Sequence, residues 1–392
     1  MICYNRFIYV TGEKFMFAKQ DKKRDGFMLN GSFADEGYDW WWHSFTAVND
    51  ATGEEKPFFI EYFTCNPELG GKDPVLGQDA YNLLTGKKPS YVMVKAGWWG
   101  SDAVQLHRYF GWENVKIHKR APYSLEADDC FAGEYELRGS VEISSKDADE
   151  HPEWMCGSGS MEWDLKLHKM IPFNVGYGAG GFFRRLKAFA MYWHAEGMKT
   201  LYSGTVKANG VTYSVYPDRC YGYADKNWGE DFTSPWVWLS SCDLTSKLTG
   251  RRLNNSVFDI GGGCPVVFNI PLQKKLLSAF YYEGEEFEFN FSKFWTMTRT
   301  KFRCKETDDA VIWHVRQENR SALIDVKVKC LKKNMLLINY EAPNGTRKHN
   351  RLWNGGNGKG VISLYEKHNK GLYLIDEIRC GHVGCEYGVY SE

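Results

Sequence analysis

The chain has 392 residues, 43% of them hydrophobic and 25% charged, so it is long enough for two domains or one large β-sandwich. Basic and acidic residues number 49 each, and this balance argues against nucleic acid or an anionic membrane surface as the partner. The aromatic share of 16% is high and favours strands and apolar pockets.

Cysteine usage and the N-terminus indicate the compartment. The eleven cysteines are scattered without a CxxC pair, which is typical of reduced thiols in a cytosol. The first 15 residues become charged too early for a signal peptide, and no apolar run reaches the length of a transmembrane helix. We therefore expect a cytoplasmic protein.

Short alternating segments dominate the chain and predict strands in antiparallel hairpins. They are 135–145, 161–170, 201–217, 285–304, 322–333 and 359–380. Turn signals separate them at Asn209-Gly210, at Asn344-Gly345 and over the glycine-rich 354–360. Helical periodicity is scarce and is confined to 101–110 and 180–198. The fold class is therefore mostly β.

A domain boundary is expected where this pattern is interrupted. The acidic stretch 145–154 and the flexible CGSGS at 156–160 break the alternation, and 172–185 has the composition of a crossing linker. We predict one domain over 1–175 and a second over 176–392, divided near Val175.

Several motifs with known chemistry are absent from the sequence. There is no GxGxxG after a strand, no phosphate loop, no GxSxG elbow and no HExxH. The ten histidines are spread singly, so no metal site is expected. The glycine runs at 178–181 and 261–263 favour close backbone approach over phosphate binding.

Ionisable and aromatic residues concentrate between residues 193 and 238. His194 and Glu196 are two positions apart, so they share a face if the segment is extended. By the same rule, one face of the stretch YGYAD carries Tyr221, Tyr223 and Asp225. If that face meets an apolar cavity, desolvation would raise the pKa of Asp225 or Glu196 and keep one carboxyl protonated near neutrality.

A neutral carboxylic acid among aromatic rings is suited to protonating an electron-rich carbon or oxygen. Nearby rings would stabilise the cation that forms, and the sequence offers Trp228, Trp236 and Trp238. The alternative is a purely structural role. Asp225 or Asn227 would then cap its own backbone in a tight turn, and His194 would be an ordinary core histidine.

At this segment the sequence resembles the tocopherol cyclase family. The family's Tyr-x-x-Lys-Asn-Trp-Gly block and Trp-x-Trp pair correspond to YADKNWGEDFTSPWVW at 223–238. Its threonine-glycine turn and GGG correspond to LTGRR at 248–252 and DIGGGCP at 259–265. Fainter echoes lie in GYDWWWHSFTAVND at 37–50 and in IRCGHVGCEYG at 378–388.

The resemblance implies two lipocalin-like antiparallel β-barrel domains, packed together around an apolar substrate pocket. Members of the wider group, which includes carotenoid hydratases, act without a cofactor on polyprenyl or polyene chains. The hydratases' Tyr-x-Asp pair matches Tyr223 and Asp225. Their His-x-Trp pair matches only at His194, because Glu196 stands where tryptophan is expected.

The leading hypothesis is a cyclase or hydratase of a prenylated or polyene substrate, without cofactor or metal. Asp225 would donate the proton, Tyr223 and His194 would orient it, and Glu196 would be a second acid or base. The expected substrate-binding residues are Trp193, Tyr221, Asn227, Trp228, Trp236 and Trp238.

Two other classes remain open from the residues alone. A binding module would hold a small hydrophobic molecule without transforming it, and its acids would point away from the pocket. A glycan-cleaving β protein would need an open cleft with paired carboxylates. For both the enzyme and the binding module, the expected partner is a small apolar molecule. Peripheral contact with lipid is compatible with either, and nucleic acid is not expected as a partner.

Overall fold

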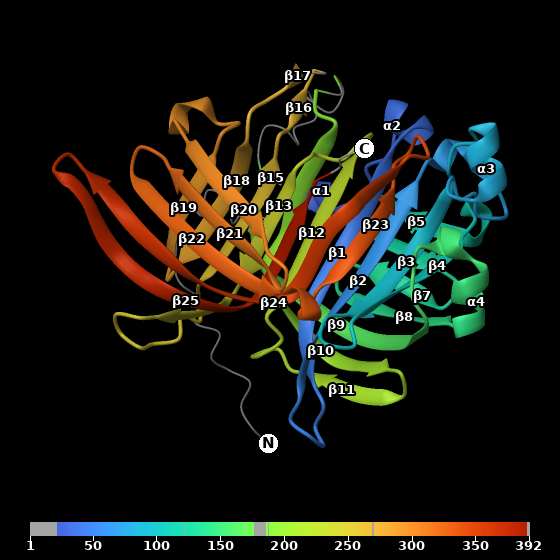
Figure 1. The fold of residues 1–392 in the computed structure, drawn as a ribbon, viewed down its shortest axis with the longest axis horizontal. Coiled ribbons are helices and arrows are strands. Elements are labelled where there is room, and N and C mark those ends of the chain that lie inside the picture. Colours follow the sequence, from blue (N-terminus) through green and yellow to red (C-terminus); the bar gives the residue numbers. More distant parts are fainter. Residues whose placement is uncertain (1–21, 121, 176–185, 187, 269, 390–392) are drawn as a thin grey trace.

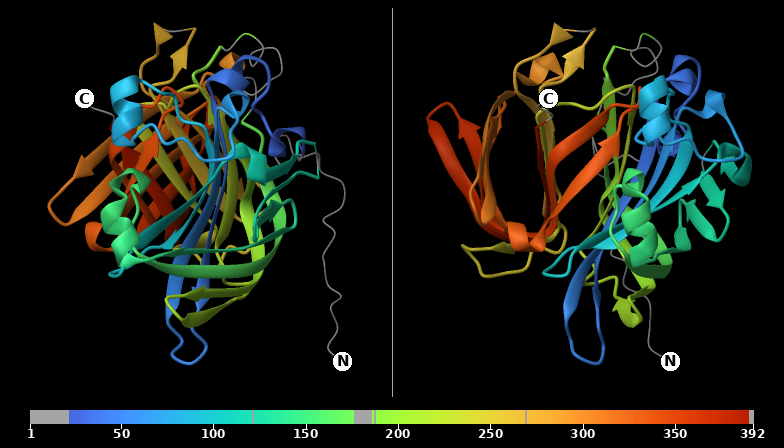
Figure 2. Two further views of the ribbon diagram at one scale, coloured as in Figure 1. Left: turned by 90° about the vertical axis from the view of Figure 1, so that its right-hand side faces the viewer. Right: turned by 45° about the vertical axis from the view of Figure 1, so that its right-hand side comes forward.

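The computed structural model describes residues 22–120, 122–175, 186, 188–268 and 270–389. Strands make up most of this part of the chain, and their pairings are antiparallel throughout two large curved sheets (Figure 1). The sheets pack side by side, as the two further views show (Figure 2). The predicted class, mostly β with two barrel-like domains packed together, is confirmed.

The first sheet, called the first barrel below, has 12 strands. Its neighbours follow the order β4 (Val104–Phe110), β3 (Tyr91–Trp98), β2 (Glu55–Cys65), β1 (Tyr38–Val48), β11 (Val211–Val215), β10 (Met191–Ala208), β9 (Gly159–Phe173), β8 (Glu136–Ile143), β7 (Cys130–Gly133), β6 (Ser124–Ala127) and β5 (Val115–His118). Strand β12 (Gly222–Gly229) pairs with both β1 and β10, so it lies in the interior of the sheet.

The second sheet, called the second barrel, has 11 strands. Its main path is β19 (Glu285–Asn290), β18 (Lys275–Tyr282), β15 (Val257–Gly263), β13 (Trp236–Ser241), β25 (Gly371–Gly388), β24 (Arg347–His368), β22 (Ala322–Leu331), β21 (Ala310–Glu318) and β20 (Arg299–Glu306). Strand β14 (Asp243–Ser246) pairs with β25, and β23 (Leu336–Glu341) pairs with β24. Ser278 of β18 donates to Gln317 of β21 at 2.6 Å, although these strands are far apart in the order, so the sheet curls on itself.

Helices are short. They are α1 (Lys22–Asp25), α2 (Ser32–Asp35), α3 (Ala80–Thr85), α4 (Ser145–Glu150) and the 3-10 turns η1 (Pro67–Leu69), η2 (Trp112–Asn114), η3 (Pro152–Trp154), η5 (Phe294–Thr296) and η6 (Lys332–Asn334). Of these, α3 and α4 lie on the outer side of the first barrel (Figure 1). A separate small hairpin joins β16 (Val266–Val267) to β17 (Ile270–Pro271). None of the helices in the described ranges combines the length and hydrophobicity that a membrane crossing requires.

Three apolar cores follow from the period of two along the strands. One fills the first barrel and includes Trp41 and Trp228, and another fills the second barrel around Trp313. The third lies between the barrels and takes residues from both, including Trp40 and Trp238. Trp40, Trp41 and Trp42 of β1 alternate between the first and third cores, which is why three consecutive tryptophans are all buried.

The sequence-predicted hairpin at Asn209-Gly210 is confirmed. It joins β10 to β11, and both residues have the positive φ that such a turn requires, 46° and 83°. The glycine-rich stretch 354–360 was predicted as a turn, and this prediction is wrong. It lies inside β24, where glycines permit register shifts against β25.

The two predicted helices are also wrong where the structure describes them. Residues 104–110 form β4 and residues 191–198 belong to β10, because sheet pairing outweighs a weak helical period. Residues 176–185 of the proposed linker lie outside the described residues. The change of sheet does not coincide with Val175: β10 to β12 complete the first barrel, and the second begins at β13.

The link from β12 to β13 positions the candidate site. Residues 230–235 carry the chain directly from a central strand of one barrel to a strand of the other. The aromatic and ionisable segment noted in the sequence therefore supplies one strand to each side of the interface between the barrels.

Candidate functional site

The register of β12 decides which side chains face the interface. The strand is paired on both sides, with Asp225 opposite Trp42 of β1, so its alternation is fixed. Tyr223 belongs to the core between the barrels, whereas Trp228 belongs to the core inside the first barrel. The predicted shared face of Tyr223 and Asp225 is thus present, and it faces the second barrel.

Strand β10 adds Trp193 to the same face. The Trp193 indole Nε1 donates to Asp225 Oδ2 at 2.8 Å, and the Tyr223 hydroxyl lies 3.1 Å from the same oxygen. The other oxygen, Asp225 Oδ1, is buried and makes no hydrogen bond within the described part of the chain. Asp225 is therefore half satisfied, with one free oxygen in an apolar setting.

The second barrel contributes a further carboxyl, Asp259 of β15. Its Oδ2 lies 3.2 Å from the Tyr223 hydroxyl, and its Oδ1 accepts from the Trp238 indole at 3.1 Å. Tyr223 thus lies between two aspartates that come from different barrels. Both aspartates are buried.

A small cavity, called the acid cavity below, opens between the barrels at Asp225. Its volume is about 20 Å³, which is room for roughly one water molecule. Glu386 of β25 lines it opposite β12 and accepts hydrogen bonds from the Trp236 indole, at 2.5 Å, and from Asn354. The complete lining is Trp40, Trp42, Met191, Asp225, Phe232, Trp236, Trp238, Tyr340, Leu352 and Glu386.

A lysine lies behind one wall of the acid cavity. The Tyr340 hydroxyl donates to Glu61 Oε2 at 2.9 Å, and Lys95 Nζ is 3.0 Å from the same oxygen. The Lys95 ammonium also lies 3.7 Å from the centre of the Tyr340 ring. This cation is therefore matched by Glu61 and by an aromatic face, and it does not pair with Asp225 or Asp259.

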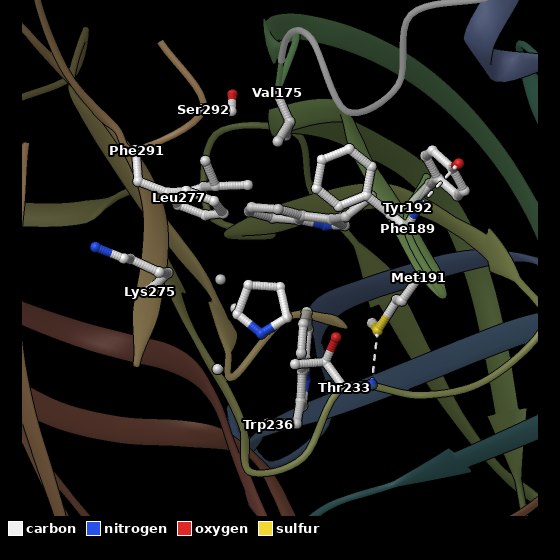
Figure 3. A pocket seen from close by; sticks show the side chains of 15 residues that line it. Val175, Phe189, Met191, Tyr192, Thr233, Trp236, Lys275, Leu277, Phe291 and Ser292 are labelled. Carbon is white, nitrogen blue, oxygen red and sulfur yellow. Dashed lines mark hydrogen bonds between the residues drawn. The ribbon is translucent and has the colours of Figure 1, made fainter. Parts of the chain in front are cut away.

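An apolar pocket adjoins the acid cavity, because Met191 and Trp236 line both. Its volume is about 70 Å³, and aromatic side chains and the glycines 261–263 form most of its wall. Figure 3 shows these rings pointing toward one another, with the Lys275 ammonium turned away from Trp236. The pocket suits an apolar group, and its lining includes one charged side chain, Lys275.

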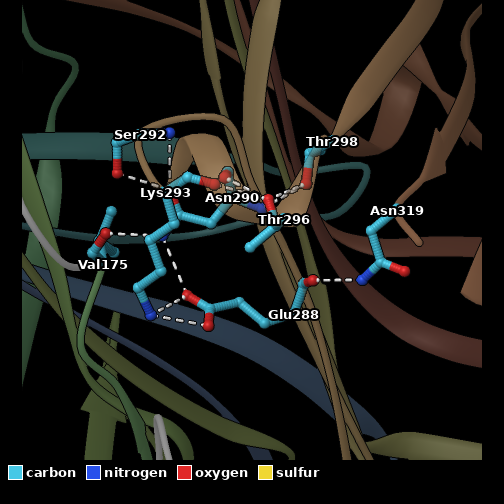
Figure 4. A network of polar contacts seen from close by, with 8 residues as sticks. All are labelled: Val175, Glu288, Asn290, Ser292, Lys293, Thr296, Thr298 and Asn319. Carbon is cyan, nitrogen blue, oxygen red and sulfur yellow. Dashed lines mark hydrogen bonds and ion pairs between the residues drawn. The ribbon is translucent and has the colours of Figure 1, made fainter. Parts of the chain in front are cut away.

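A polar network holds the loop beside this pocket. Asn290 Nδ2 donates to the Val175 carbonyl at 2.9 Å, and so ties the end of β19 to the segment that follows β9 (Figure 4). Glu288 binds Lys293 through both carboxylate oxygens at 2.7 Å. Because Val175, Phe291 and Ser292 line the apolar pocket, this network fixes one of its walls.

Burial shifts the pKa values of the acids at the interface. It raises the pKa of Asp225 to about 8, against the hydrogen bond from Trp193 and with the negative charge of Glu386 adding to the rise. Burial raises the pKa of Glu386 to about 7, opposed by hydrogen bonds from Trp236 and Asn354. The pKa of Asp259 lies well above its usual value because of burial and then the charge of Asp225.

His194 and Glu196 lie on the opposite face of β10 from Trp193. His194 Nε2 is 3.0 Å from Asp25 Oδ1, and Glu196 forms an ion pair with Lys169, so both face the first barrel. The predicted shared face of the two residues is present. The predicted orientation of Asp225 by His194 is not, because the alternation of β10 and β12 places them on different sides of the sheet.

These residues belong to a buried set that we call the ion-paired cluster. A further pair, Lys226 with Asp39, completes it, and the Lys226 ammonium lies 3.8 Å from the centre of the Trp41 ring. Its members are Asp25, Asp39, Lys169, His194, Glu196 and Lys226. Burial raises the pKa of Glu196 to about 8 even beside Lys169.

The expected substrate-binding residues divide between the faces. Trp193 and Trp236 line the apolar pocket, and Trp236 and Trp238 line the acid cavity. Trp228 stacks on Tyr192 inside the first barrel, with ring centres 5.6 Å apart, and so points away from both. Near the interface, Asn227 accepts from the Tyr38 hydroxyl at 2.8 Å, while Tyr221 stacks on His382 beside a third cavity.

Sequence reasoning missed Asp259, Glu386 and Tyr340. Asp259 precedes the glycine run 261–263, and Glu386 lies in the closing stretch 378–388, where the family resemblance is faint. Neither carboxyl has a local motif of its own. Their only sequence signal is an acidic residue at a position that alternation would place on the inward face of a strand. This signal can be interpreted only when it is known which face of each strand points inward.

Metal binding has no support from the described residues, where no three histidine, cysteine, aspartate or glutamate side chains are arranged to hold an ion. The interface instead offers neutral donors and carboxyls around an apolar space. That set can hold and move a proton and can exclude water from an apolar molecule.

No protein-family model matches this chain, and no curated protein does. Solved structures with a similar chain path include a protein provisionally named AttH from Nitrosomonas europaea, with a TM-score of 0.48, 12% identity, and coverage of 92% of this chain and 95% of that one. Another is kievitone hydratase from Nectria haematococca, with a TM-score of 0.43, 13% identity, and coverage of 96% and 99%. The chemistry of this chain therefore has to be inferred from its own residues.

Proposed function

We propose that this protein is an enzyme that adds an O–H bond across a carbon–carbon double bond of a small apolar molecule. The observation that supports it best is the free oxygen of Asp225, buried in a cavity walled by aromatic rings. A carboxyl with a pKa of about 8 carries its proton at neutral pH, when most carboxyls have lost theirs. It can give that proton to an alkene carbon.

Protonation leaves a carbocation on the substrate and a carboxylate on Asp225. The rings of Trp40, Trp236 and Trp238 line the cavity and would stabilise the cation by about 0.5–2 kcal/mol each. Because water has little access to this space, the cation survives until an oxygen captures it. The substrate's apolar body would occupy the adjoining pocket.

An O–H group then attacks the cation and must lose its proton. Glu386 faces the same cavity, and two N–H donors favour its ionised form, so it serves as the base. One proton leaves Asp225 and one arrives at Glu386, and transfer between them across the cavity restores the resting state. Two carboxyls with different surroundings thus divide the acid and base roles.

The oxygen can come from water or from the substrate itself. Water gives a tertiary alcohol, as in a hydratase, whereas an internal phenol gives a ring, as in a tocopherol cyclase-like enzyme. The volume of the acid cavity does not distinguish the two reactions, because the alkene carbon and the attacking oxygen must both reach Asp225 there. Cyclisation would need the substrate's own hydroxyl to occupy that space.

The test uses purified protein, a panel of short prenylated phenols and terpenoid alkenes, and water enriched in oxygen-18. Hydration transfers the label to the product, and cyclisation yields an unlabelled isomer, so mass spectrometry separates the two reactions. Asp225→Asn is expected to lower turnover by about 10²–10⁴-fold, the usual contribution of a general acid.

The matched control is Asp50→Asn, which changes an exposed carboxyl bound to Ser214 and Tyr216 and should leave turnover unchanged. Tight binding of a panel member without any conversion would favour a hydrophobic-ligand carrier over an enzyme. Full turnover by a folded Asp225→Asn protein would remove Asp225 from the mechanism.

A further inference from the structure

Tyr223 lies between two carboxyls, and its single hydroxyl hydrogen can be donated to only one of them. Its hydroxyl oxygen is 3.1 Å from Asp225 Oδ2 and 3.2 Å from Asp259 Oδ2. A phenol donates one hydrogen bond and accepts others. Both contacts can be hydrogen bonds only if one of the carboxyls donates to the phenol. At least one of the two carboxyls is therefore protonated whenever both contacts are made.

The outer contacts favour one direction of donation. The Trp193 and Trp238 indoles can only donate, and they do so to Asp225 Oδ2 and Asp259 Oδ1. The oxygen that lacks a hydrogen bond within the described residues is Asp225 Oδ1, on the acid cavity. If Asp225 carries its proton on Oδ1, Oδ2 is the carbonyl oxygen that accepts from both Trp193 and Tyr223; Asp259 then donates to Tyr223, and Asp225 Oδ1 presents its own proton to the cavity.

The surroundings favour protons on both carboxyls. The ionisable groups that act most on Asp225 are Glu386, Tyr223 and Glu61, with Tyr202 and Tyr340 also within reach of its charge, and those that act on Asp259 are Asp225 and Tyr223. Among the described residues neither aspartate forms an ion pair with a lysine, arginine or histidine. Two buried negative charges so close together, without a cation, would repel each other strongly.

We propose that Asp259, acting through Tyr223, is the proton reserve of Asp225. The proposal rests on the proposed function. As the Asp225 Oδ1–H bond breaks and the proton reaches the substrate, the Tyr223 proton moves to Asp225 Oδ2 and the Asp259 proton moves to Tyr223. Asp225 ends protonated on Oδ2 instead of Oδ1, Tyr223 again carries one proton, and the negative charge rests on Asp259. The proton later gained by Glu386 returns along the same path.

Asp259 touches no part of the acid cavity, so it is a positioning residue for Asp225. The two carboxyls belong to β12 and β15, on different barrels. The loaded acid therefore exists only when the barrels are docked, which gives their interface a chemical role as well as a structural one.

The experiment is infrared difference spectroscopy of the full-length protein at neutral pH, where a protonated carboxyl shows a C=O band that a carboxylate lacks. Wild type is compared with Asp225→Asn, Asp259→Asn and Asp50→Asn. The first two variants are each expected to lose one protonated-carboxyl band, and the exposed Asp50 is expected to contribute none. Tyr223→Phe should retain both bands at shifted frequencies, because each carboxyl loses a hydrogen-bond partner.

The outcomes separate this inference from the proposed function. Loss of a band in Asp225→Asn but not in Asp259→Asn would overturn the proton reserve and leave the acid role of Asp225 intact. No band lost in either variant would overturn both. If Asp259→Asn does not fold, carbon-13 NMR of aspartate-labelled wild type and Tyr223→Phe decides instead: two protonated aspartates in wild type support the reserve, and one overturns it.

Discussion

Strands β10 and β12 carry buried acids on both faces, and the acids on the two faces have different partners. Toward the first barrel, each acid of the ion-paired cluster has a cationic or histidine partner within 4.0 Å, as in Asp39 with Lys226. Toward the second barrel, Asp225 and Asp259 have neutral donors, which are the Tyr223 hydroxyl, tryptophan indoles and, for Asp259, the Ile260 backbone. The acids that face the first barrel each have a lysine or histidine beside them, whereas Asp225 and Asp259 have no such partner among the described residues.

This difference suggests two roles: the ion-paired cluster contributes to the stability of the fold, and the acids at the interface between the barrels are the candidates for proton transfer. In the ion-paired cluster a neighbouring lysine or histidine offsets the charge of each carboxylate, although burial still raises the pKa of Glu196 to about 8. A neutral carboxyl with one free oxygen on a cavity holds a proton that it can give away. For this reason the candidate site lies between the barrels and not inside either one.

The largest expected effect on stability is at the ion-paired face. Lys226→Met leaves Asp39 buried without its cation and should lower the free energy of unfolding by about 3–5 kcal/mol in urea titration. The double variant Lys226→Met with Asp39→Leu should recover most of that loss. Asp225→Leu, on the other face, leaves the Trp193 indole and the Tyr223 hydroxyl without their acceptor and should cost about 1–3 kcal/mol, less than Lys226→Met. A large loss in Asp225→Leu would break the comparison.

The pH dependence of stability should differ in sign from the usual carboxylate case. Because the folded pKa of Asp225 is about 8 and its unfolded value is near 3.8, the folded state binds the proton more tightly. Stability from this group is complete below the unfolded pKa and declines as pH rises through the folded one, by about 1.4 kcal/mol per pH unit. Asp225→Asn should remove that slope in urea titrations between about pH 5 and pH 8. An unchanged slope would show that Asp225 ionises normally.

Gly261→Ala tests how the packing of Trp193 against Gly261 positions its indole at the interface. A Cβ on Gly261 would lie 2.8 Å from the Trp193 ring, so the indole must shift away from Asp225. Overpacking of this kind costs about 1–3 kcal/mol of stability. The lost indole hydrogen bond should also raise the pKa of Asp225 further, which an infrared pH titration would detect. A titration identical to wild type would mean that the Trp193 contact is unimportant.

The smallest effect on turnover is expected from His194→Gln. His194 pairs with Asp25 on the far face of β10, and glutamine can still donate to that carboxylate. Stability should fall by about 1 kcal/mol, in the range of a single hydrogen bond, while turnover of any substrate found remains within the error of the assay. A loss of turnover comparable to that of Asp225→Asn would show that His194 does take part in the reaction.

The alternation of the sequence predicted several local relations of the site. It placed Tyr223 with Asp225 on one face, and His194 with Glu196 on another, because side chains in a strand repeat every two residues. It could not say how those faces relate, since this depends on which residues of β10 and β12 stand opposite each other. Trp228 was expected in the pocket, although the same period of two puts it on the face opposite Asp225, and in β12 it points into the first barrel.

Residue types and their period by themselves determined that the chain is mostly β, that its hairpin turns at Asn209-Gly210, and that acids and aromatic rings share one segment. These are local properties, and neighbouring residues suffice to specify them. Only the tertiary structure decided that the segment crosses from one barrel to the other, and that Asp259 and Glu386 meet Asp225 there. Desolvation and proton sharing depend on which distant strands pack together, and short sequence patterns do not encode that.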